Sequence, residues 1–350
     1  MRSQELIQKW LYLGCVMIFI MVMIGGITRL TGSGLSITEW NVIMGTIPPL
    51  NEKDWSEAFE KYKNFPQFKL VNQEMNMGEF KEIFFWEYFH RLWGRLIGIA
   101  FLIPFIYFLV KKKFKPEMSK KLIVLFALGA LQGVIGWFMV KSGLQDRPSV
   151  SHYRLATHLI MALILYSYLL YLAFGMTRFS HKFQINTHSK SALKISNIII
   201  VIIFFQLFYG ALMAGLKAGL NYPTYPTMNG QWIPDELWAL EGFFTNLFSN
   251  KATVQFIHRI VPIVLGFSLV ALVIHKKKHK KYYYSSTLNK YTAAALIIYA
   301  AQFALGIITV INCKGYIPVF WGVAHQMGAL VLLTACLIIN FRIRKGLSRS

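Results

Sequence analysis

Eight long apolar stretches constrain this chain more than any other feature of its sequence. They lie at about residues 11–29, 88–110, 121–141, 152–174, 194–216, 254–274, 291–311 and 318–340. A helix needs about 20 apolar residues to cross the hydrocarbon core of a bilayer, and each stretch is close to that length. With 55% hydrophobic and 15% charged residues among 350, the composition excludes an ordinary soluble domain. We therefore predict an all-α membrane protein with eight transmembrane helices.

The basic residues predict how these helices are oriented. A formal net charge of +22 would suggest nucleic-acid binding in a soluble protein, but most of the 37 Lys and Arg lie at the two ends and in three segments, around 111–121, 177–194 and 275–290. In an eight-span chain all five segments face one side, and positively charged loops stay in the cytoplasm. We therefore expect cytoplasmic termini and no nucleic-acid partner. Membrane lipid is a further candidate partner of the basic loops, although their part in setting the topology already accounts for the charge.

The second half of the chain repeats the first. Spans one to four align with spans five to eight, and the alignment pairs Gly25 with Gly210, His90 with His258, Gln132 with Gln302 and His158 with His325. Repeats of four helices preserve direction across the membrane, so they are parallel repeats. We predict two four-helix bundles, at 1–176 and 194–350, joined by a cytoplasmic linker at 177–193, with a long external loop at 30–87 in the first bundle.

The repeat-matched histidines are the candidate ligands. His90, His158, His258 and His325 each lie near the start of an even-numbered span, at a similar depth toward the external side. Each bundle thus has one histidine on its second helix and one on its fourth, as bis-imidazole ligation of a haem iron requires. A histidine near the interface can also serve only as an amphipathic side chain. Zinc is disfavoured because the pairs bring no cysteine and no clear third ligand.

Small and basic residues beside the histidines fit a flat macrocycle. Gly94 and Gly98 follow His90 on one helix face, and Gly266 occupies the position of Gly98 in the second half. Arg91 and Arg259 directly follow their histidines and are suitably placed to pair with haem propionates. The alternatives are ordinary helix packing for the glycines and snorkelling to the interface for the arginines.

One carboxyl breaks the symmetry of the repeat. Glu87 lies three residues before His90, whereas the aligned position in the second half is Gln255. A buried carboxyl beside a metal centre could relay protons or stabilise positive charge. The alternative is a carboxyl that caps the start of the helix in water.

Several motifs, in order along nearly the whole chain, resemble those of haem A synthases. They are GGITRLTGSGLSITEW, EYFHRLWGRLIG, LQGVIGW, RLATHLIMAL, FIHRIVPIVLG and GVAHQMGAL. The long first loop has no cysteine pair, which resembles the proteobacterial and mitochondrial branch. The resemblance implies an eight-helix inner-membrane oxidoreductase that oxidises the C8 methyl of haem O to a formyl group, giving haem A for cytochrome oxidase.

The resemblance also implies roles for individual residues. His258 and His325 would be the axial ligands of a haem b cofactor, which Arg259 would help to bind. His90, His158 and Arg91 would bind the substrate haem, and Glu87 would be the catalytic carboxyl. Haem O synthase and an electron-transfer protein are the expected partners, together with a homo-oligomer.

Two other functions remain open at this point. A b-type cytochrome for electron transfer shares paired histidines, but such proteins usually stack their haems across the membrane, whereas all four histidines here lie toward one side. A haem transporter would have polar residues near the bilayer midplane, where this chain offers mainly Gln132, Gln206 and Gln302.

Overall fold

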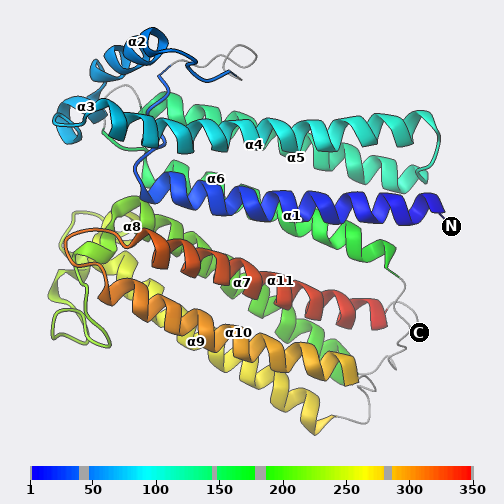
Figure 1. Ribbon diagram of the computed structural model, residues 1–350. Coiled ribbons are helices and arrows are strands. Elements are labelled where there is room, and N and C mark those ends of the chain that lie inside the picture. The colour runs from blue at the N-terminus through cyan, green and yellow to red at the C-terminus, as the bar shows by residue number, and fades with distance from the viewer. Residues whose placement is uncertain (1, 39–46, 144–147, 178–186, 280–285, 348–350) are drawn as a thin grey trace. The chain divides into compact units, whose positions relative to one another are not determined.

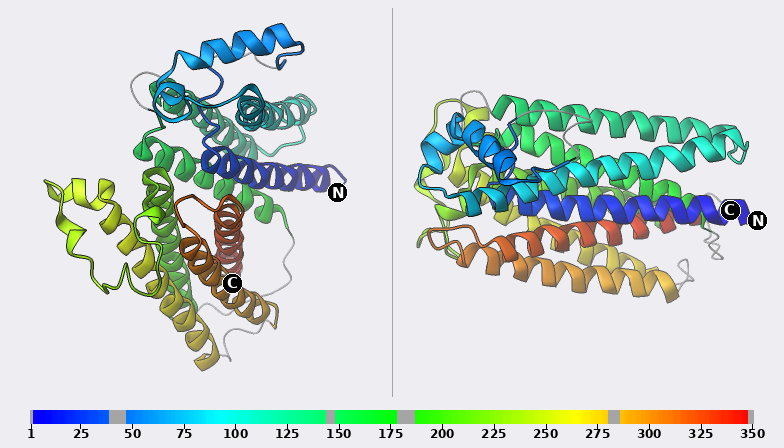
Figure 2. Two further views of the ribbon diagram at one scale, coloured as in Figure 1. Left: turned by 60° about the vertical axis from the view of Figure 1, so that its left-hand side comes forward. Right: turned by 45° about the horizontal axis from the view of Figure 1, so that its top comes forward.

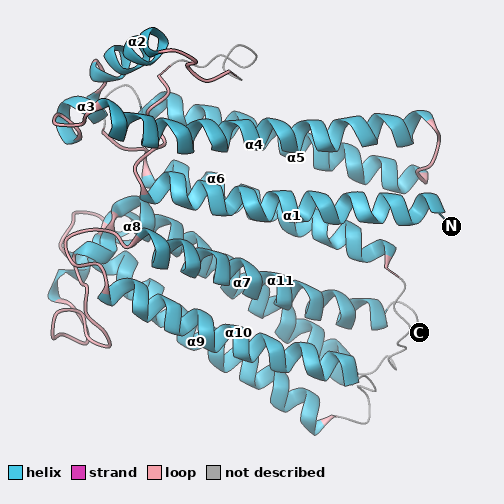
Figure 3. Cartoon of the chain, in the orientation of Figure 1, coloured by secondary structure: helices cyan, strands magenta, loops and turns pink. Residues whose placement is uncertain are grey.

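The computed structural model describes residues 2–38, 47–143, 148–177, 187–279 and 286–347. Within these ranges the regular structure is helical, apart from an isolated bridge between Met228 and Gln231 (Figure 3). Eight helices in the same ranges are long and apolar enough to cross a membrane: Ser3–Leu30, Met77–Val110, Pro116–Lys141, His152–Met176, Lys190–Leu216, Lys251–Lys278, Leu288–Ile311 and Val319–Lys345. The predicted fold class, a multi-pass all-α membrane protein, is confirmed.

The chain forms two compact units, Met1–Leu169 and Leu170–Ser350, with the boundary inside a helix. The predicted external loop and linker include residues 39–46 and 178–186, which lie outside the described residues. The domain limits drawn from the repeat stay a prediction.

The first unit is built on a pair of antiparallel helices. It contains α1 (Arg2–Leu30), α2 (Glu52–Lys63), α3 (Pro66–Val71), α4 (Met77–Val110), α5 (Pro116–Gly143) and most of α6 (His152–Met176). Helices α1 and α4 run side by side in opposite directions (Figures 1 and 2). Pro104 has no N–H for the carbonyl of Ala100, and the indole of Trp10 donates to that carbonyl at 2.9 Å. This contact joins α1 to α4 at the point where the proline removes a backbone hydrogen bond of the helix.

Helix α4 begins at Met77, well before the apolar stretch that starts at about residue 88. Asn76 and Glu79 form a capping box: the Asn76 side chain accepts from the N–H of Glu79, and the Glu79 carboxylate accepts from the N–H of Asn76. Hydropathy detects the membrane-spanning part of a helix but not a polar extension, so the prediction placed the helix start too late. Glu87 and His90 consequently lie several turns inside α4.

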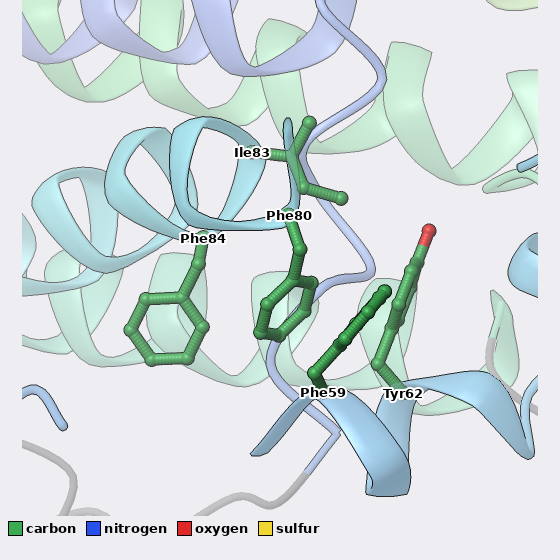
Figure 4. Close-up of a cluster of buried hydrophobic side chains, with 5 residues drawn as sticks. All are labelled: Phe59, Tyr62, Phe80, Ile83 and Phe84. Carbon is green, nitrogen blue, oxygen red and sulfur yellow. The ribbon is translucent and has the colours of Figure 1, made fainter. Parts of the chain in front are cut away.

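A small aromatic cluster joins α2 and α3 to the start of α4. Phe59, Tyr62, Phe80, Ile83 and Phe84 are buried together (Figure 4). The ring of Phe80 stacks on those of Phe59 and Tyr62, with centroid distances of 4.9 and 5.2 Å. Rings of this size supply much of the buried apolar area of a small cluster. The cluster therefore holds these short helices at the end of the unit where α4 begins (Figure 1).

A chain of hydrogen bonds extends from this cluster to the end of α1. Burial raises the pKa of Tyr62, so its hydroxyl stays protonated and donates to Gln67 Oε1 at 3.1 Å. The Gln67 amide donates in turn to the carbonyl of Gly32 at 2.7 Å. Gly32 has a φ of +72°, a conformation that glycine adopts readily. The segment that follows α1 is thus fixed where it passes the first turns of α4.

The second unit has a similar helical composition. Besides the end of α6 it contains α7 (Thr187–Leu216), η2 (Ala218–Leu220), η3 (Asp235–Trp238), α8 (Phe243–Ser249), α9 (Lys251–Lys278), α10 (Ser286–Ile311) and α11 (Val319–Leu347). Helix α7 packs against α9 and α11, and α10 packs along α11. The amide of Asn340 on α11 donates to Ser196 Oγ and Asn197 Oδ1 on α7 at 2.9 and 2.7 Å. Interhelical hydrogen bonds of this kind support helix packing in membranes.

Candidate functional site

Each of the repeat-matched histidines lies against a glycine on the preceding long helix. A Cβ added at the glycine would meet the imidazole, at 3.3 Å for Gly25 and His90, 2.9 Å for Gly136 and His158, 3.1 Å for Gly210 and His258, and 2.9 Å for Gly306 and His325. A Cβ at Gly136 or Gly306 would force a shift, and a Cβ at Gly25 or Gly210 would require the imidazole to move by a few tenths of an ångström. Glycine at these positions therefore allows the imidazole to pack directly on the neighbouring backbone.

The two histidines of the second unit also meet. In the second unit the ring centroids of His258 and His325 are 6.2 Å apart, with an interplanar angle of 81°. In the first unit His90 on α4 packs on Gly25, and His158 on α6 packs on Gly136. The structure thus brings the second pair together and supports each histidine of the first pair in the same way, while their role as ligands stays a prediction.

Glutamine side chains bind several of these histidines, a contact that the sequence did not predict. Gln206 Nε2 lies 3.0 Å from His258 Nδ1 and donates to the His258 carbonyl at 2.9 Å. Gln302 Nε2 lies 3.0 Å from His325 Nδ1 and donates to the His325 carbonyl at 2.8 Å. Gln132 Nε2 is 3.2 Å from His158 Nδ1 and donates to the His158 carbonyl at 3.1 Å. A signal was available, because each glutamine lies four residues before the glycine that contacts its histidine.

Pro262 explains one of these contacts. A proline four residues after His258 cannot donate to the His258 carbonyl, which leaves that carbonyl without its helical partner. The amide of Gln206 fills this position from α7. The carbonyl of Pro262 accepts in turn from the hydroxyl of Tyr299 at 2.8 Å. The turn of α9 that carries His258 is therefore held by side chains from two neighbouring helices.

Glu87 is buried, with 3% of its surface exposed, and it accepts hydrogen bonds from three groups. Its Oε2 atom accepts from Ser36 Oγ at 2.7 Å and from the N–H of Ile37 at 2.8 Å. Its Oε1 atom accepts from Arg91 Nη2 at 2.5 Å. This geometry excludes the alternative of a carboxyl that caps a helix start in water. The sequence did not identify Ser36 and Ile37, which lie 51 and 50 residues from Glu87 along the chain.

Both arginines that follow the histidines bind the loop near their own helix. Arg91 donates to Glu87 and also to the carbonyl of Ile37 at 3.1 Å. Arg259 donates to the carbonyls of Tyr222 and Thr227 at 2.9 and 3.1 Å. Gln255 donates to the same Tyr222 carbonyl at 2.9 Å, so it lacks the ion pair that Glu87 makes with Arg91. The propionate contacts expected of the arginines stay a prediction.

The glycines expected to accommodate a macrocycle differ between the units. A Cβ at Gly266 would lie 2.5 Å from the Tyr299 hydroxyl, so the backbone there is already covered by α10. A Cβ at Gly94 would lie 3.4 Å from the Met21 methyl, and one at Gly98 would meet no described atom within 4 Å. Gly266 therefore serves helix packing.

The donor atoms present favour ligation by two imidazoles. Among the described residues, no group of three or more His, Cys, Asp or Glu side chains could hold a metal ion. Two imidazoles on opposite sides of one metal, with bonds of about 2 Å, have ring centres roughly 6 Å apart, close to the observed 6.2 Å. The Oε1 atoms of Gln132, Gln206 and Gln302 are buried and have no hydrogen-bond partner among the described residues. It is the Nε2 atom of each glutamine that faces the histidine Nδ1, so an imidazole protonated at Nδ1, as in a metal-bound histidine, would need the amide to turn by about 180° to present Oε1.

Comparison with known proteins gives one consistent family. Residues 8–337 match the cytochrome oxidase assembly protein family COX15-CtaA. The chain is 44% identical to the haem A synthase of Nitrosospira multiformis, over 98% of this chain and 94% of the relative. It is 42% identical to the haem A synthase of Nitrosomonas eutropha (94% and 91%) and 41% identical to that of Flavobacterium psychrophilum (95% and 96%). On this evidence the chain belongs to the COX15-CtaA family of cytochrome oxidase assembly proteins.

Proposed function

We propose that this chain is a haem A synthase, a membrane oxidoreductase that converts the C8 methyl of haem O into a formyl group and so supplies haem A to cytochrome oxidase. Support comes from relatives of that name that align over nearly the full chain. The observation that carries the proposal is the pairing of His258 and His325, whose ring centroids are 6.2 Å apart. Two imidazoles at this spacing suit the two axial positions of a haem iron.

In this proposal the two histidine pairs have different tasks. His258 and His325 would hold a resident haem b, whose iron would supply one-electron transfer when bound. His90 and His158 bind haem O, the substrate. The assignment is supported by the carboxylate at Glu87, because only the first pair has an acidic residue within one helical turn of a ligand.

Glu87 acts on the substrate pocket as a fixed negative charge in this proposal. It is one turn from His90 on α4, and Ser36, Ile37 and Arg91 hold both of its oxygens. A charge fixed in advance stabilises developing positive charge without reorganisation during the reaction. The same carboxylate could accept a proton released as the methyl group is oxidised.

Arg91 and Arg259 are proposed to bind propionates of the substrate haem and of haem b. Each guanidinium is already oriented by loop carbonyls, at Ile37 for Arg91 and at Tyr222 and Thr227 for Arg259. Preorganisation of this kind reduces the entropy lost when a carboxylate is bound. Arg91 would then lie between two carboxylates, the propionate and Glu87.

The contacts of three glutamines argue against the alternative of a haem transporter. It depended on Gln132, Gln206 and Gln302 as polar groups along a substrate path. Their amide nitrogens instead donate to the carbonyls of His158, His258 and His325. Side chains engaged in this way support the histidines rather than line a path.

We also propose the setting in which the reaction takes place. The basic segments place both termini in the cytoplasm and the protein in the inner membrane, with the histidine pairs toward the external side. Haem O synthase would deliver the substrate, and an electron-transfer protein and a homo-oligomer complete the expected partners.

The function is tested in cells that make haem O but lack their own haem A synthase. Expression of this chain should convert haem O to haem A, measured by chromatography of extracted haems. The purified protein should give a low-spin pyridine haemochrome spectrum of haem b. A haem b spectrum with no haem A formed would favour the electron-transfer cytochrome, and the absence of bound haem would contradict both functions.

A further inference from the structure

One position in the first unit departs from the support given to the other histidines. Counting back four residues from each glycine that contacts a histidine gives Gln132, Gln206 and Gln302, but Met21 for the glycine that contacts His90. Residues four apart lie one above the other on a helix face. The side chain that meets the histidine turn is therefore an amide in α5, α7 and α10 and a thioether in α1.

The amides are anchored to their histidines at two points. Each Nε2 atom donates to the histidine's backbone carbonyl and lies within 3.2 Å of its Nδ1 atom. A bond to the backbone fixes the glutamine relative to the turn that carries the imidazole. A bond to the ring then fixes the rotation of the imidazole itself.

Met21 cannot do the same for His90. Its methyl group points at the α4 backbone one turn beyond His90, 3.4 Å from where a Cβ of Gly94 would be. A thioether has no N–H to donate and its sulfur is a weak acceptor. The described residues give the His90 ring no hydrogen-bond partner, and the ring packs on Gly25 instead.

This difference matters for a metal ligand. When one nitrogen of an imidazole binds a metal, the other carries a proton and needs an acceptor, which orients the ring and raises its basicity. Gln132, Gln206 and Gln302 each carry a buried amide oxygen without a partner in the described chain. Their Nε2 atoms now face Nδ1, and a turn of the amide by about 180° would bring this oxygen to a protonated Nδ1. Met21 offers no equivalent acceptor.

We propose that Met21 makes His90 an exchangeable axial ligand, whereas Gln206 and Gln302 hold His258 and His325 as permanent ones. The inference rests on the proposed function, in which the first pair binds a substrate and the second a cofactor. A substrate haem must enter and its product must leave in every turnover, so a weaker ligand favours exchange. His158 keeps Gln132 and remains the fixed ligand of the first pair.

The test measures the rate at which haem leaves each pocket. The purified full-length protein is loaded with haemin, and its transfer to excess apomyoglobin is followed by absorbance. The wild-type protein should show a fast phase, which His90→Ala removes, and a slow phase from the second pair. Met21→Gln should slow the fast phase roughly tenfold, the size of one added hydrogen bond. Met21→Leu, which adds no amide, should leave the rate of the fast phase unchanged.

Reciprocal and spectroscopic measurements separate ligand tuning from a packing effect. Gln206→Met should accelerate the slow phase roughly tenfold. Met21→Gln should also lower the midpoint potential of the haem in the first pocket, because a more basic imidazole stabilises the ferric state. In turnover, kcat should fall together with KM, since product release becomes slower while binding becomes tighter.

Two failures are distinguishable. If the wild-type protein binds no second haem, or if His90→Ala leaves the fast phase intact, the proposed substrate pocket is wrong. If the fast phase depends on His90 but Met21→Gln releases haem at the wild-type rate, the role of Met21 is refuted while the pocket stands. Should Met21→Gln fail to fold, an unchanged slow phase in Gln206→Met would refute the inference on its own.

Discussion

Replacement of Glu87 by glutamine separates the chemical and structural uses of this carboxylate. An amide keeps the shape of the side chain, and its oxygen can still accept from Ser36 and Ile37, which both bind Oε2. Its NH₂ group then replaces Oε1 and faces Arg91 Nη2, so two hydrogen-bond donors face each other. In the wild-type protein Oε1 and Nη2 are 2.5 Å apart. Arg91, whose side chain is 12% exposed, loses its counter-charge.

The hydrogen bonds of Glu87 determine how much Glu87→Gln should destabilise the segment that follows α1. Removing one member of a buried ion pair costs about 3–5 kcal/mol, and the two retained hydrogen bonds place Glu87→Gln at the lower end of this range. About 3 kcal/mol corresponds to roughly a hundredfold increase in local opening. Hydrogen exchange of a peptide covering residues 31–38 should accelerate by about this factor. Haem A formation should fall by about 100-fold or more, the range for loss of a positioned acid or base. The variant should retain haem b, and haem O or a partly oxidised alcohol should accumulate.

A second substitution decides between the two uses. Arg91→Gln in the Glu87→Gln background removes the unpaired charge, so exchange in residues 31–38 should return toward the wild-type rate, with a coupling of about 2 kcal/mol. Haem A should still not form, because the carboxylate is missing. Recovery of haem A in the double variant would refute the chemical role and leave Glu87 as a loop anchor. Glu79→Gln, a carboxyl in the capping box of the same helix, is the control and should keep full haem A formation.

Three further outcomes test the site and the topology. His258→Ala or His325→Ala should remove the resident haem b, and a wild-type low-spin spectrum with full haem content would contradict the assignment. Gly136→Ala should displace the His158 imidazole, which would lie 2.9 Å from the new Cβ, and so reduce haemin uptake by the first pocket. Gly129→Ala on the same helix is the control: its Cβ would meet no described atom within 4 Å, so haemin uptake should not change. Alkaline phosphatase fused after residue 115 should be inactive and fused after residue 60 active, and the opposite pattern would reverse the proposed orientation.

The membrane-spanning helices could be predicted from sequence because the bilayer imposes their length. Apolar runs of about 20 residues have few alternatives in a polytopic chain. The polar extension of α4 had a local signal, Asn76 followed three residues later by Glu79, which hydropathy does not register. Helix starts outside the hydrocarbon therefore depend on capping residues.

The partners of the site residues were harder to predict. Ser36 and Ile37 reach Glu87 from a segment that is held in part through Gly32 and Gln67, and Gln67 is in turn bound by Tyr62. No spacing in the sequence encodes a contact that passes through three separate segments. The free carbonyl of His258, in contrast, follows directly from Pro262, although the sequence does not reveal that Gln206 fills it.

Alignment of the two halves was informative chiefly where the halves differ. The first half has a carboxylate at Glu87 and a thioether at Met21, and the second has amides at both positions, Gln255 and Gln206. A carboxylate that stabilises positive charge would be of little use beside a permanent cofactor, and an exchangeable ligand would lose that cofactor. Under the proposed function the two differences are coupled, because each suits a pocket that transforms and releases what it binds. The coupling would be wrong if substitution of only one of the two residues, Glu87 or Met21, affected turnover while substitution of the other changed neither haem exchange nor haem A formation. The repeat would then have diverged at that second residue without functional consequence.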